Sequence, residues 1–115
     1  MLADYDRGVR EHMIDFLFIG ATLVGLIETK RESDHLLVVN LAVSPAFQGR
    51  GYGRVLLDYA EQLAGSPRLP EVKLFTNKQF TTNVEFYMRR GYTIDGEEPF
   101  MGGFLVHFAK RTVIS

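Results

Sequence analysis

The amino-acid sequence predicts a single domain, residues 1–115, built on a mixed α/β sheet, and three observations lead to this prediction. The length of 115 residues is typical of one domain. Apolar runs of strand-forming residues fill the first part of the chain, after which helical and strand patterns alternate. Hydrophobic residues make up 46% and charged residues 23% of the chain, which is typical of globular proteins and excludes global disorder.

Composition narrows the classes of function. The chain carries 13 Lys and Arg residues against 14 Asp and Glu residues, so no basic excess exists to neutralise a nucleic-acid backbone. The absence of cysteine excludes disulfides, thiolate metal sites and a cysteine nucleophile, and it fits a reducing cytoplasm. No apolar run reaches the ~18 residues of a membrane span, and residues 1–7 lack the apolar core of a signal peptide. We therefore expect a cytoplasmic protein without nucleic-acid, membrane or metal partners.

Three apolar runs predict the first three strands, at residues 12–19, 22–30 and 35–43. Gly20-Ala21 separates the first two runs, a pattern that is typical of a β-hairpin. The third run, HLLVVNLAV, is almost continuously apolar, as expected of a strand covered on both faces. Ser44-Pro45 ends this strand, because proline cannot continue a central ladder.

Two helices and three short strands are predicted for the rest of the chain. Apolar residues at helical spacing predict a first helix from about Gly51 to Ala64. The second helix is expected to start at Thr82, whose spacing to Glu85 fits a capping box, and to end at Arg90 before a left-handed Gly91. The predicted strands are residues 72–76, 92–94 and 104–113, with a loop at 96–103.

The most informative stretch is the glycine-rich turn between the third strand and the first helix, Gln48-Gly49-Arg50-Gly51-Tyr52-Gly53. A helix N-terminus leaves about four N–H groups unpaired, and glycines remove side chains that would keep an anion away. The turn therefore predicts a phosphate or pyrophosphate ligand. A P-loop is absent, and Arg54 occupies the small-residue position of the dinucleotide fingerprint. A glycine-rich turn without a ligand remains the alternative.

The same turn has the form Q/R-x-x-G-x-G/A and resembles the acetyl-CoA pyrophosphate loop of the GNAT N-acetyltransferase superfamily. Residues 40–45, NLAVSP, resemble the family's fourth strand, which ends in a V-x-P turn. Residues 83–92, NVEFYMRRGY, resemble its N-x-x-x-F-Y-x-x-x-G-F/Y helix and the strand after it. The resemblance covers roughly residues 12–113. It implies a GNAT-like fold that lacks most of the first strand and the first two helices.

The resemblance implies acetyl-CoA as the cofactor, with its pantetheine lying between two parallel strands that splay apart. Backbone groups of the fourth strand would pair with the pantetheine, the turn would hold the pyrophosphate, and two arginines would add charge. The implied cofactor contacts are Leu41, Ala42, Val43, Gln48, Gly49, Arg50, Gly51, Tyr52, Gly53, Arg54 and Asn83. Thr76 and Asn77 are further candidates for the cofactor wall. A solvated surface for the arginines and a helix first-turn role for Asn83 remain alternatives.

The resemblance also implies the reaction, in which a primary amine directly attacks the thioester in a ternary complex. Tyr87 matches the family tyrosine that points at the cofactor sulfur, and its phenol would protonate the leaving thiolate. A core aromatic beside Phe86 is the alternative role for Tyr87. A backbone N–H at Ala42 or Val43 would meet the oxyanion of the tetrahedral intermediate.

The sequence leaves the general base unassigned. Asn40 stands near the place where some family members carry a glutamate, and an amide cannot take the proton. Glu28, His35, His107 or a chain of water molecules remain as candidates. Proximity of a neutral amine can itself supply much of the rate in such reactions.

The acceptor is expected to be a small-molecule amine or a protein amine. In the family, the segment that this chain lacks forms one wall of the acceptor site. A misassigned or trimmed start, a partner subunit, or the acceptor's own surface would each account for that difference. The acidic residues Asp95, Glu97 and Glu98 could attract a cationic amine, although solvated loop charges are the alternative.

Two hypotheses concern the assembly of the protein and an alternative to catalysis. The final apolar run, residues 104–113, suggests that two copies pair into a homodimer. A non-catalytic acyl-CoA-binding module is the alternative to the enzyme.

Overall fold

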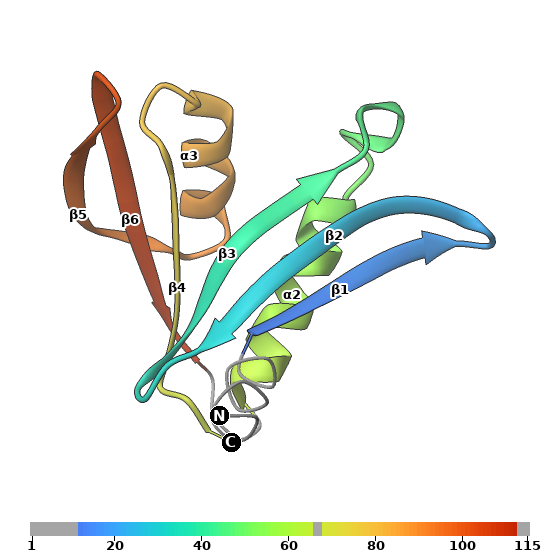
Figure 1. The fold of residues 1–115 in the computed structure, drawn as a ribbon, viewed down its shortest axis with the longest axis horizontal. Helices are drawn as coiled ribbons and strands as arrows, with labels where there is room; N and C mark the ends of the chain where they lie inside the picture. The colour runs from blue at the N-terminus through green and yellow to red at the C-terminus, as the bar shows by residue number, and fades with distance from the viewer. Residues whose placement is uncertain (1–11, 66–67, 113–115) are drawn as a thin grey trace, which may run out of the picture.

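The structure, a computed structural model, describes residues 12–65 and 68–112 as one six-stranded sheet with two α-helices and a short 3₁₀ turn (Figure 1). The strands are β1 His12–Ile19, β2 Thr22–Arg31, β3 His35–Val43, β4 Glu71–Asn77, β5 Thr93–Phe100 and β6 Gly103–Arg111. The turn η1 is Pro45–Phe47, and the helices are α2 Tyr52–Gly65 and α3 Thr81–Arg89. The predicted α/β order is confirmed.

The sheet has the order β1-β2-β3-β4-β6-β5, in which only the β3–β4 pair is parallel. The first three strands and the first helix lie within one residue of their predicted bounds, since their apolar patterns are strong and local. The predicted loop at residues 96–103 is wrong, because β5 continues to Phe100 and forms a hairpin with β6. Met101 and Gly102 both have positive φ and make the tight turn of that hairpin.

The start of α3 also differs from the prediction. Its N-cap residue is Phe80, and no side chain caps the helix, whereas Thr82 lies inside the first turn. The capping box of Thr82 and Glu85 is therefore wrong, because the N-cap lies two residues before Thr82. The predicted end is confirmed in its main feature, since Gly91 follows the helix with φ of 92°.

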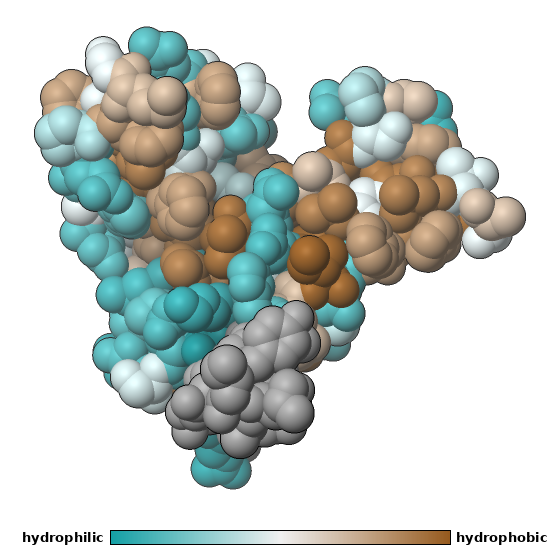
Figure 2. Space-filling model, viewed as in Figure 1, coloured by the Kyte–Doolittle hydropathy of each residue, from teal (hydrophilic) through white to brown (hydrophobic). Residues whose placement is uncertain are grey.

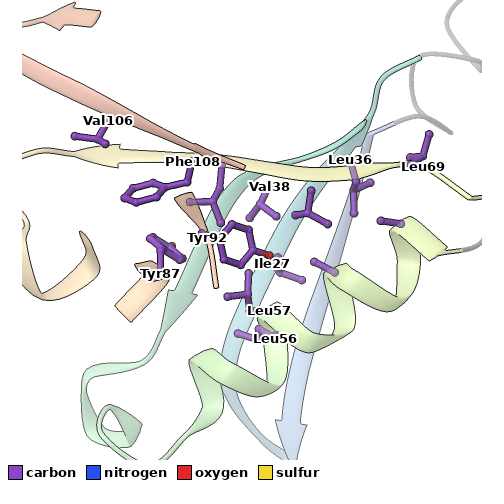
Figure 3. Close-up of a cluster of buried hydrophobic side chains, with 14 residues drawn as sticks. Ile27, Leu36, Val38, Leu56, Leu57, Leu69, Tyr87, Tyr92, Val106 and Phe108 are labelled. Carbon is purple, nitrogen blue, oxygen red and sulfur yellow. The ribbon is translucent and has the colours of Figure 1, made fainter. Parts of the chain in front are cut away.

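A continuous core joins the sheet to both helices (Figure 3). The apolar face of α2 supplies Leu56, Leu57, Ala60 and Ala64, which are buried against the sheet. Tyr92 and Phe108 are the largest of the fully buried side chains and connect this core to α3. Burial of these groups gives the sheet a helix-covered face and an opposite face without a helix among the described residues.

The two parallel strands separate part-way along their length. β3 and β4 pair only from His35–Glu71 to Val38–Leu74, and Figure 1 shows them diverging beyond that point. The register of β3 against β2 shifts between Glu28 and Thr29, and such a bulge increases the local bend of a strand. The sheet thus divides into a first arm, β1, β2 and β3 with α2, and a second arm, β4, β6 and β5 with α3.

The position of β6 corrects the hypothesis of pairing through the last strand. β6 lies inside the sheet and pairs with β4 on one side and β5 on the other. The strands at the two ends of the sheet are β1 and β5 instead. Val113, the predicted end of the last strand, lies outside the described residues.

Candidate functional site

A tightly bent connection links the end of β3 to α2. The Ser44 N–H donates to the Val24 carbonyl at 2.8 Å, and the Gln48 amide donates to the Val43 carbonyl at 3.1 Å. Gly49 and Gly51 have φ of 79° and 89°, a left-handed conformation that disfavours other residues. A Cβ at either position would meet nothing within 4 Å, so the backbone conformation, not space, requires glycine there.

The start of α2 offers unpaired N–H donors. The first N–H that closes a helical turn belongs to Val55, which donates to the Gly51 carbonyl at 3.2 Å. The N–H groups of Tyr52, Gly53 and Arg54 precede it and have no helical carbonyl to bond. No acidic residue lies in this first turn, so the positive end of the helix dipole is uncompensated by a carboxylate of the helix. The local geometry suits an anion.

This helix end opens into a cavity of about 660 Å³ between the two arms. Figure 2 shows the notch that separates the arms on the surface. The cavity is lined by Leu41, Ala42, Val43, Phe47, Gln48, Gly49, Gly51, Tyr52, Gly53, Arg54, Thr82, Asn83, Phe86 and Tyr87. Tyr87 and all of the implied cofactor contacts are among them except Arg50, whose guanidinium lies 5.5 Å from the centre of the Phe47 ring.

The first turn of α3 forms the opposite wall. Asn83 Nδ2 donates to Thr76 Oγ1 at 3.3 Å, which ties the helix to β4 just beyond the point where β4 leaves β3. Thr76 therefore supports the wall from behind and does not line it. Asn77 accepts a hydrogen bond from the Gln79 N–H at 2.9 Å and belongs to the turn after β4, away from the predicted cofactor wall.

Tyr87 connects the core to the cavity. The residue is 8% exposed, and its ring centroid lies 5.4 Å from that of Phe86 and 5.7 Å from that of Phe108. Tyr87 nevertheless lines the cavity. Burial raises the pKa of the Tyr87 phenol above its ordinary value. Tyr87 is thus a core aromatic that also lines the cavity, and burial favours the protonated form of its phenol.

The three candidate bases each lie in a histidine–carboxylate pair. His35 Nδ1 is 2.7 Å from Asp34, and this hydrogen bond lowers the pKa of Asp34. Glu28 pairs with His12 across β1 and β2. His107 Nε2 is 2.7 Å from Glu98 across the β5–β6 hairpin.

The acidic residues of the hairpin face basic partners. Lys73 lies 3.5 Å from Asp95, and Lys78 lies 3.2 Å from Glu97. Together with the Glu98–His107 contact, these pairs leave the hairpin without a cluster of unpaired carboxylates among the described residues. The structure therefore favours local ion pairs over an open acidic patch for this part of the predicted acceptor mouth.

Phe47, Thr82 and Phe86 line the cavity, although the sequence did not single them out as site residues. Phe86 directly precedes Tyr87, and Thr82 directly precedes Asn83. Their position next to predicted site residues is the sequence signal that could have identified them. Phe47 lies in η1 between the proline and the glycine turn, where its ring also makes an edge contact with Tyr52 at 6.1 Å.

The described residues offer neither a membrane-spanning helix nor a metal site. None of their helices combines the length and the hydropathy that a membrane crossing requires. In residues 12–65 and 68–112, no group of three or more His, Asp or Glu side chains is arranged to hold a metal ion.

The chain is similar to known acetyltransferases in sequence. The acetyltransferase (GNAT) family model matches residues 2–92. Spermidine N(1)-acetyltransferase of Thermoplasma acidophilum is 28% identical over 86 residues, which are 71% of this chain and 53% of that protein. An uncharacterised N-acetyltransferase of Schizosaccharomyces pombe is 26% identical over 87 residues, 72% of this chain and 60% of that protein. The chain spans about half the length of the curated relatives it matches.

Solved structures of acetyltransferases share the fold. The ribosomal-protein-S18-alanine N-acetyltransferase from Escherichia coli has a TM-score of 0.82 at 16% identity, over 99% of this chain and 77% of that one. The PaiA N-acetyltransferase from Thermoplasma acidophilum, solved in complex with coenzyme A, has a TM-score of 0.73 at 22% identity, over 84% of this chain and 60% of that one. At these identities the likeness establishes the fold.

Proposed function

Because the chain belongs to the acetyltransferase (GNAT) family, we propose that it transfers the acetyl group of acetyl-CoA to the nitrogen of a primary amine. The observation that carries this proposal is the cavity between the arms, which extends from the N-terminal end of α2 to Tyr87. A long cofactor with a pyrophosphate at one end and a reactive thioester at the other fits a site of this shape. Residues 1–115 act as one domain in this proposal.

The pyrophosphate would lie at the start of α2. The unpaired N–H groups of Tyr52, Gly53 and Arg54 donate to its oxygens, and the helix dipole favours its charge. Gly49 and Gly51 let the backbone approach, and the Arg54 guanidinium adds a charge-assisted contact. Arg50 stacks on Phe47 and lies outside the cavity lining, so we assign it no phosphate contact.

The pantetheine arm would occupy the gap between β3 and β4. Leu41, Ala42 and Val43 follow the last β3–β4 pair, so the edge of β3 that faces the gap lacks a strand partner there. Backbone polar groups need hydrogen-bond partners, and the amides of pantetheine supply them as a neighbouring strand would. Asn83, held by Thr76, reaches the cofactor from the other wall.

Tyr87 would protonate the leaving sulfur. The amine attacks the thioester carbonyl, a backbone N–H at Ala42 or Val43 stabilises the oxyanion, and the C–S bond then breaks. The thiolate takes a proton from the Tyr87 hydroxyl, which burial keeps protonated well above neutral pH.

The acceptor is proposed as a cationic primary amine on a small molecule or a protein. The relative from Thermoplasma acidophilum is named for spermidine, and the Escherichia coli structure is named for an alanine of ribosomal protein S18. One observation favours the second candidate function, a non-catalytic acyl-CoA-binding module. Asn40 lies on β3 opposite Glu28, and its amide cannot act as a base.

Calorimetric titration with acetyl-CoA, with ATP and NAD as controls, tests the cofactor. We expect micromolar binding of acetyl-CoA alone. An assay of acetyl transfer to spermidine, an aminoglycoside and a peptide with an N-terminal alanine then tests the reaction. Binding without any product supports the module, and no binding of acetyl-CoA overturns both functions.

A further inference from the structure

We propose that His107, held by Glu98, removes the proton from the acceptor amine before the amine attacks the thioester. This inference rests on the acetyl transfer proposed above, because it assigns the base of that same reaction. Three features of the sheet support it. His107 lies on the face opposite the cofactor cavity, its neighbour Phe75 borders the gap, and Glu98 contacts its ring.

His107 lies on the sheet face opposite the cofactor cavity. Its neighbours in β6, Val106 and Phe108, are buried on the helix-covered face, and successive side chains of a strand point to opposite faces. The cavity is lined from the helix-covered face, by α2 and α3. An amine that attacks a thioester held in the gap must approach from the face that the cofactor leaves free, which is the face of His107.

The neighbour of His107 in the sheet borders the gap. Phe75 pairs with His107 across β4 and β6, and their ring centroids are 5.8 Å apart. The last residue of β4 that pairs with β3 is Leu74, so Phe75 is the first residue of β4 beside the open gap. Thr76 and Leu74 are buried toward the helices, which turns the Phe75 side chain to the same face as His107. An amine over Phe75 is therefore within reach of the imidazole, directly or across one water molecule.

The contact with Glu98 leaves one ring nitrogen open. Nε2 of His107 lies 2.7 Å from the carboxylate of Glu98, so the tautomer that donates this hydrogen bond carries its lone pair on Nδ1. The His107 side chain is 37% exposed, and Gly96, its direct partner in β5, places no side chain beside the imidazole. Lys73, the charged group next along β4 on this face, is paired with Asp95.

The other two histidine–carboxylate pairs fit the role less well. His35 pairs with Glu71 across β3 and β4, at the closed end of the gap. Glu28 lies on β2, where Asn40 of β3 separates it from the gap and His12 binds its carboxylate. Imidazole as a group also exchanges protons nearer neutral pH than a carboxylate does.

The acceptor nitrogen loses two protons during the reaction. The ammonium group gives one proton to Nδ1 of His107, which later releases it to solvent. The neutral amine forms the C–N bond, and the C–S bond breaks as the tetrahedral intermediate collapses. Tyr87 protonates the thiolate, and the second proton that leaves the nitrogen replaces the one that Tyr87 gave. The products are the amide, the free thiol of coenzyme A and one proton in solution.

The test compares two kinds of acceptor in the His107→Gln variant. The protonated acceptor is whichever of spermidine, the aminoglycoside and the alanyl peptide the wild type acetylates fastest, and methoxyamine is the acceptor that is already neutral at pH 7. We expect kcat/KM for the protonated acceptor to fall at least about 100-fold. We expect the rate with methoxyamine and the affinity for acetyl-CoA to stay within about twofold, because neither requires the base. His35→Gln is the matched control and should change none of these values.

Two further variants test the role of Glu98 and the alternative base Glu28. Glu98→Gln alters an exposed side chain and keeps His107, so it should fold and lower the rate for the protonated acceptor alone, by a smaller factor. Equal losses with both acceptors in His107→Gln, or no loss with either, overturn the proposal. A selective loss in Glu28→Gln in place of His107→Gln assigns the base to Glu28 and overturns it as well. A wild-type protein that binds acetyl-CoA and acetylates nothing refutes the proposed function instead, since that result does not depend on His107.

Discussion

Tyr87 is the residue on which packing and chemistry depend together. Its ring contacts three aromatic neighbours in the core, and its hydroxyl group belongs to a residue that lines the cavity. A change that removes only the oxygen separates these roles, because the ring keeps its contacts. The stability of the fold and the rate of the reaction should therefore respond differently to the same substitution.

Tyr87→Phe should lower kcat by about 100-fold or more, since the thiolate then leaves without a proton donor. The free energy of unfolding should change by less than about 1 kcal/mol, because no hydrogen bond to another described residue is lost. Steady-state kinetics, calorimetry with acetyl-CoA and urea denaturation measure the three quantities. An unchanged kcat would remove Tyr87 from the mechanism.

Tyr92 links the pH dependence of stability to a buried hydrogen bond. Its hydroxyl donates to Glu61 Oε2 at 2.9 Å, and Lys110 Nζ lies 3.2 Å from the same carboxylate. Burial, and then the charge of Glu61, raise the pKa of Tyr92. The folded state thus holds this proton more tightly than the unfolded chain, where tyrosine titrates near pH ~10. The stability contributed by the phenol is complete below that pH and is lost as pH rises above it.

The destabilisation caused by Tyr92→Phe should therefore depend on pH. At pH 8 the variant should be less stable by about 1 kcal/mol, because the hydrogen bond to Glu61 is gone. Between pH 10 and 11, a range set by the ordinary tyrosine pKa of about 10, the wild type should lose stability faster and the difference should shrink. Urea denaturation from pH 8 to 11 measures both. Parallel pH curves for the two proteins would contradict this account.

The connection between β3 and α2 shows how an element depends on single glycines. Gly51 has φ of 89°, and a residue with a Cβ pays about 1–2 kcal/mol for that conformation. Gly20, in the β1–β2 turn, also has a positive φ, of 61°, but it does not line the cavity. The two positions therefore separate the effect on folding from the effect on cofactor binding.

Gly51→Ala should lower the free energy of unfolding by about 1–2 kcal/mol and weaken acetyl-CoA binding at least tenfold, because the N–H groups of α2 shift. Gly20→Ala should cost a similar amount of stability and leave binding unchanged. Thermal denaturation and calorimetry on both variants give the comparison. Equal losses of affinity would show that the effect is one of global stability.

The start of α3 has no side-chain cap, which makes a stabilising substitution predictable. Phe80 occupies the N-cap and is 57% exposed, so its replacement removes little packing. Phe80→Ser should raise the free energy of unfolding by about 1 kcal/mol, since the hydroxyl can accept from an unpaired N–H of the first turn. Thr82→Ala, at the position where the sequence predicted the cap, should change it by less than about 0.5 kcal/mol. Urea denaturation that gives the reverse order would restore the predicted capping box.

The strength of the local pattern decided which elements could be predicted. The bounds of β1 and β3 coincide with their apolar runs, and the glycine turn was recognised because its ligand-binding geometry lies within a few consecutive residues. Only the start of β5 was predicted, as the strand at residues 92–94. Its continuation to Phe100 was not predicted, because every residue of β5 is exposed and no alternation of apolar and polar residues marks the strand. The N-cap position of Phe80 could not be predicted, because its side chain makes no capping hydrogen bond and so gives no sequence signal.

At the level of the whole molecule, the site depends on relations that no local pattern contains. The gap exists because β3 and β4 pair over only four residues of each, and the sequence of either strand does not reveal where its partner leaves it. The contact of His107 with Phe75 and Glu98 depends on the registers of three strands. The resemblance to a family predicted the gap, whereas the base could be assigned only from the arrangement of the strands.

The first arm exposes apolar side chains on the face of the sheet that α2 does not cover. Figure 2 shows hydrophobic residues gathered over β1 and β2, and Ile14, Phe16 and Phe18 are each about half exposed. These residues face away from α2, since their neighbours Met13, Asp15 and Leu17 are the more buried set in β1. β1 is also the end strand of the sheet, so its backbone is unpaired on one side among the described strands. This unpaired edge can serve as a reference in hydrogen-exchange measurements.

Binding of acetyl-CoA should join the two arms and protect the backbone beside the gap. At a concentration of 100 times Kd, a ligand that binds only the folded state stabilises it by about 2.7 kcal/mol. Beyond this global effect, we expect the amides of residues 39–43 to exchange at least tenfold more slowly, because the pantetheine then occupies the edge of β3 that β4 leaves. Residues 12–19 form an equally unpaired edge without a ligand, so their local exchange should stay the same. Hydrogen exchange measured by mass spectrometry, with ATP as the control ligand, distinguishes the two edges. Equal protection of both edges would mean that the cofactor acts only through global stability and does not lie along β3.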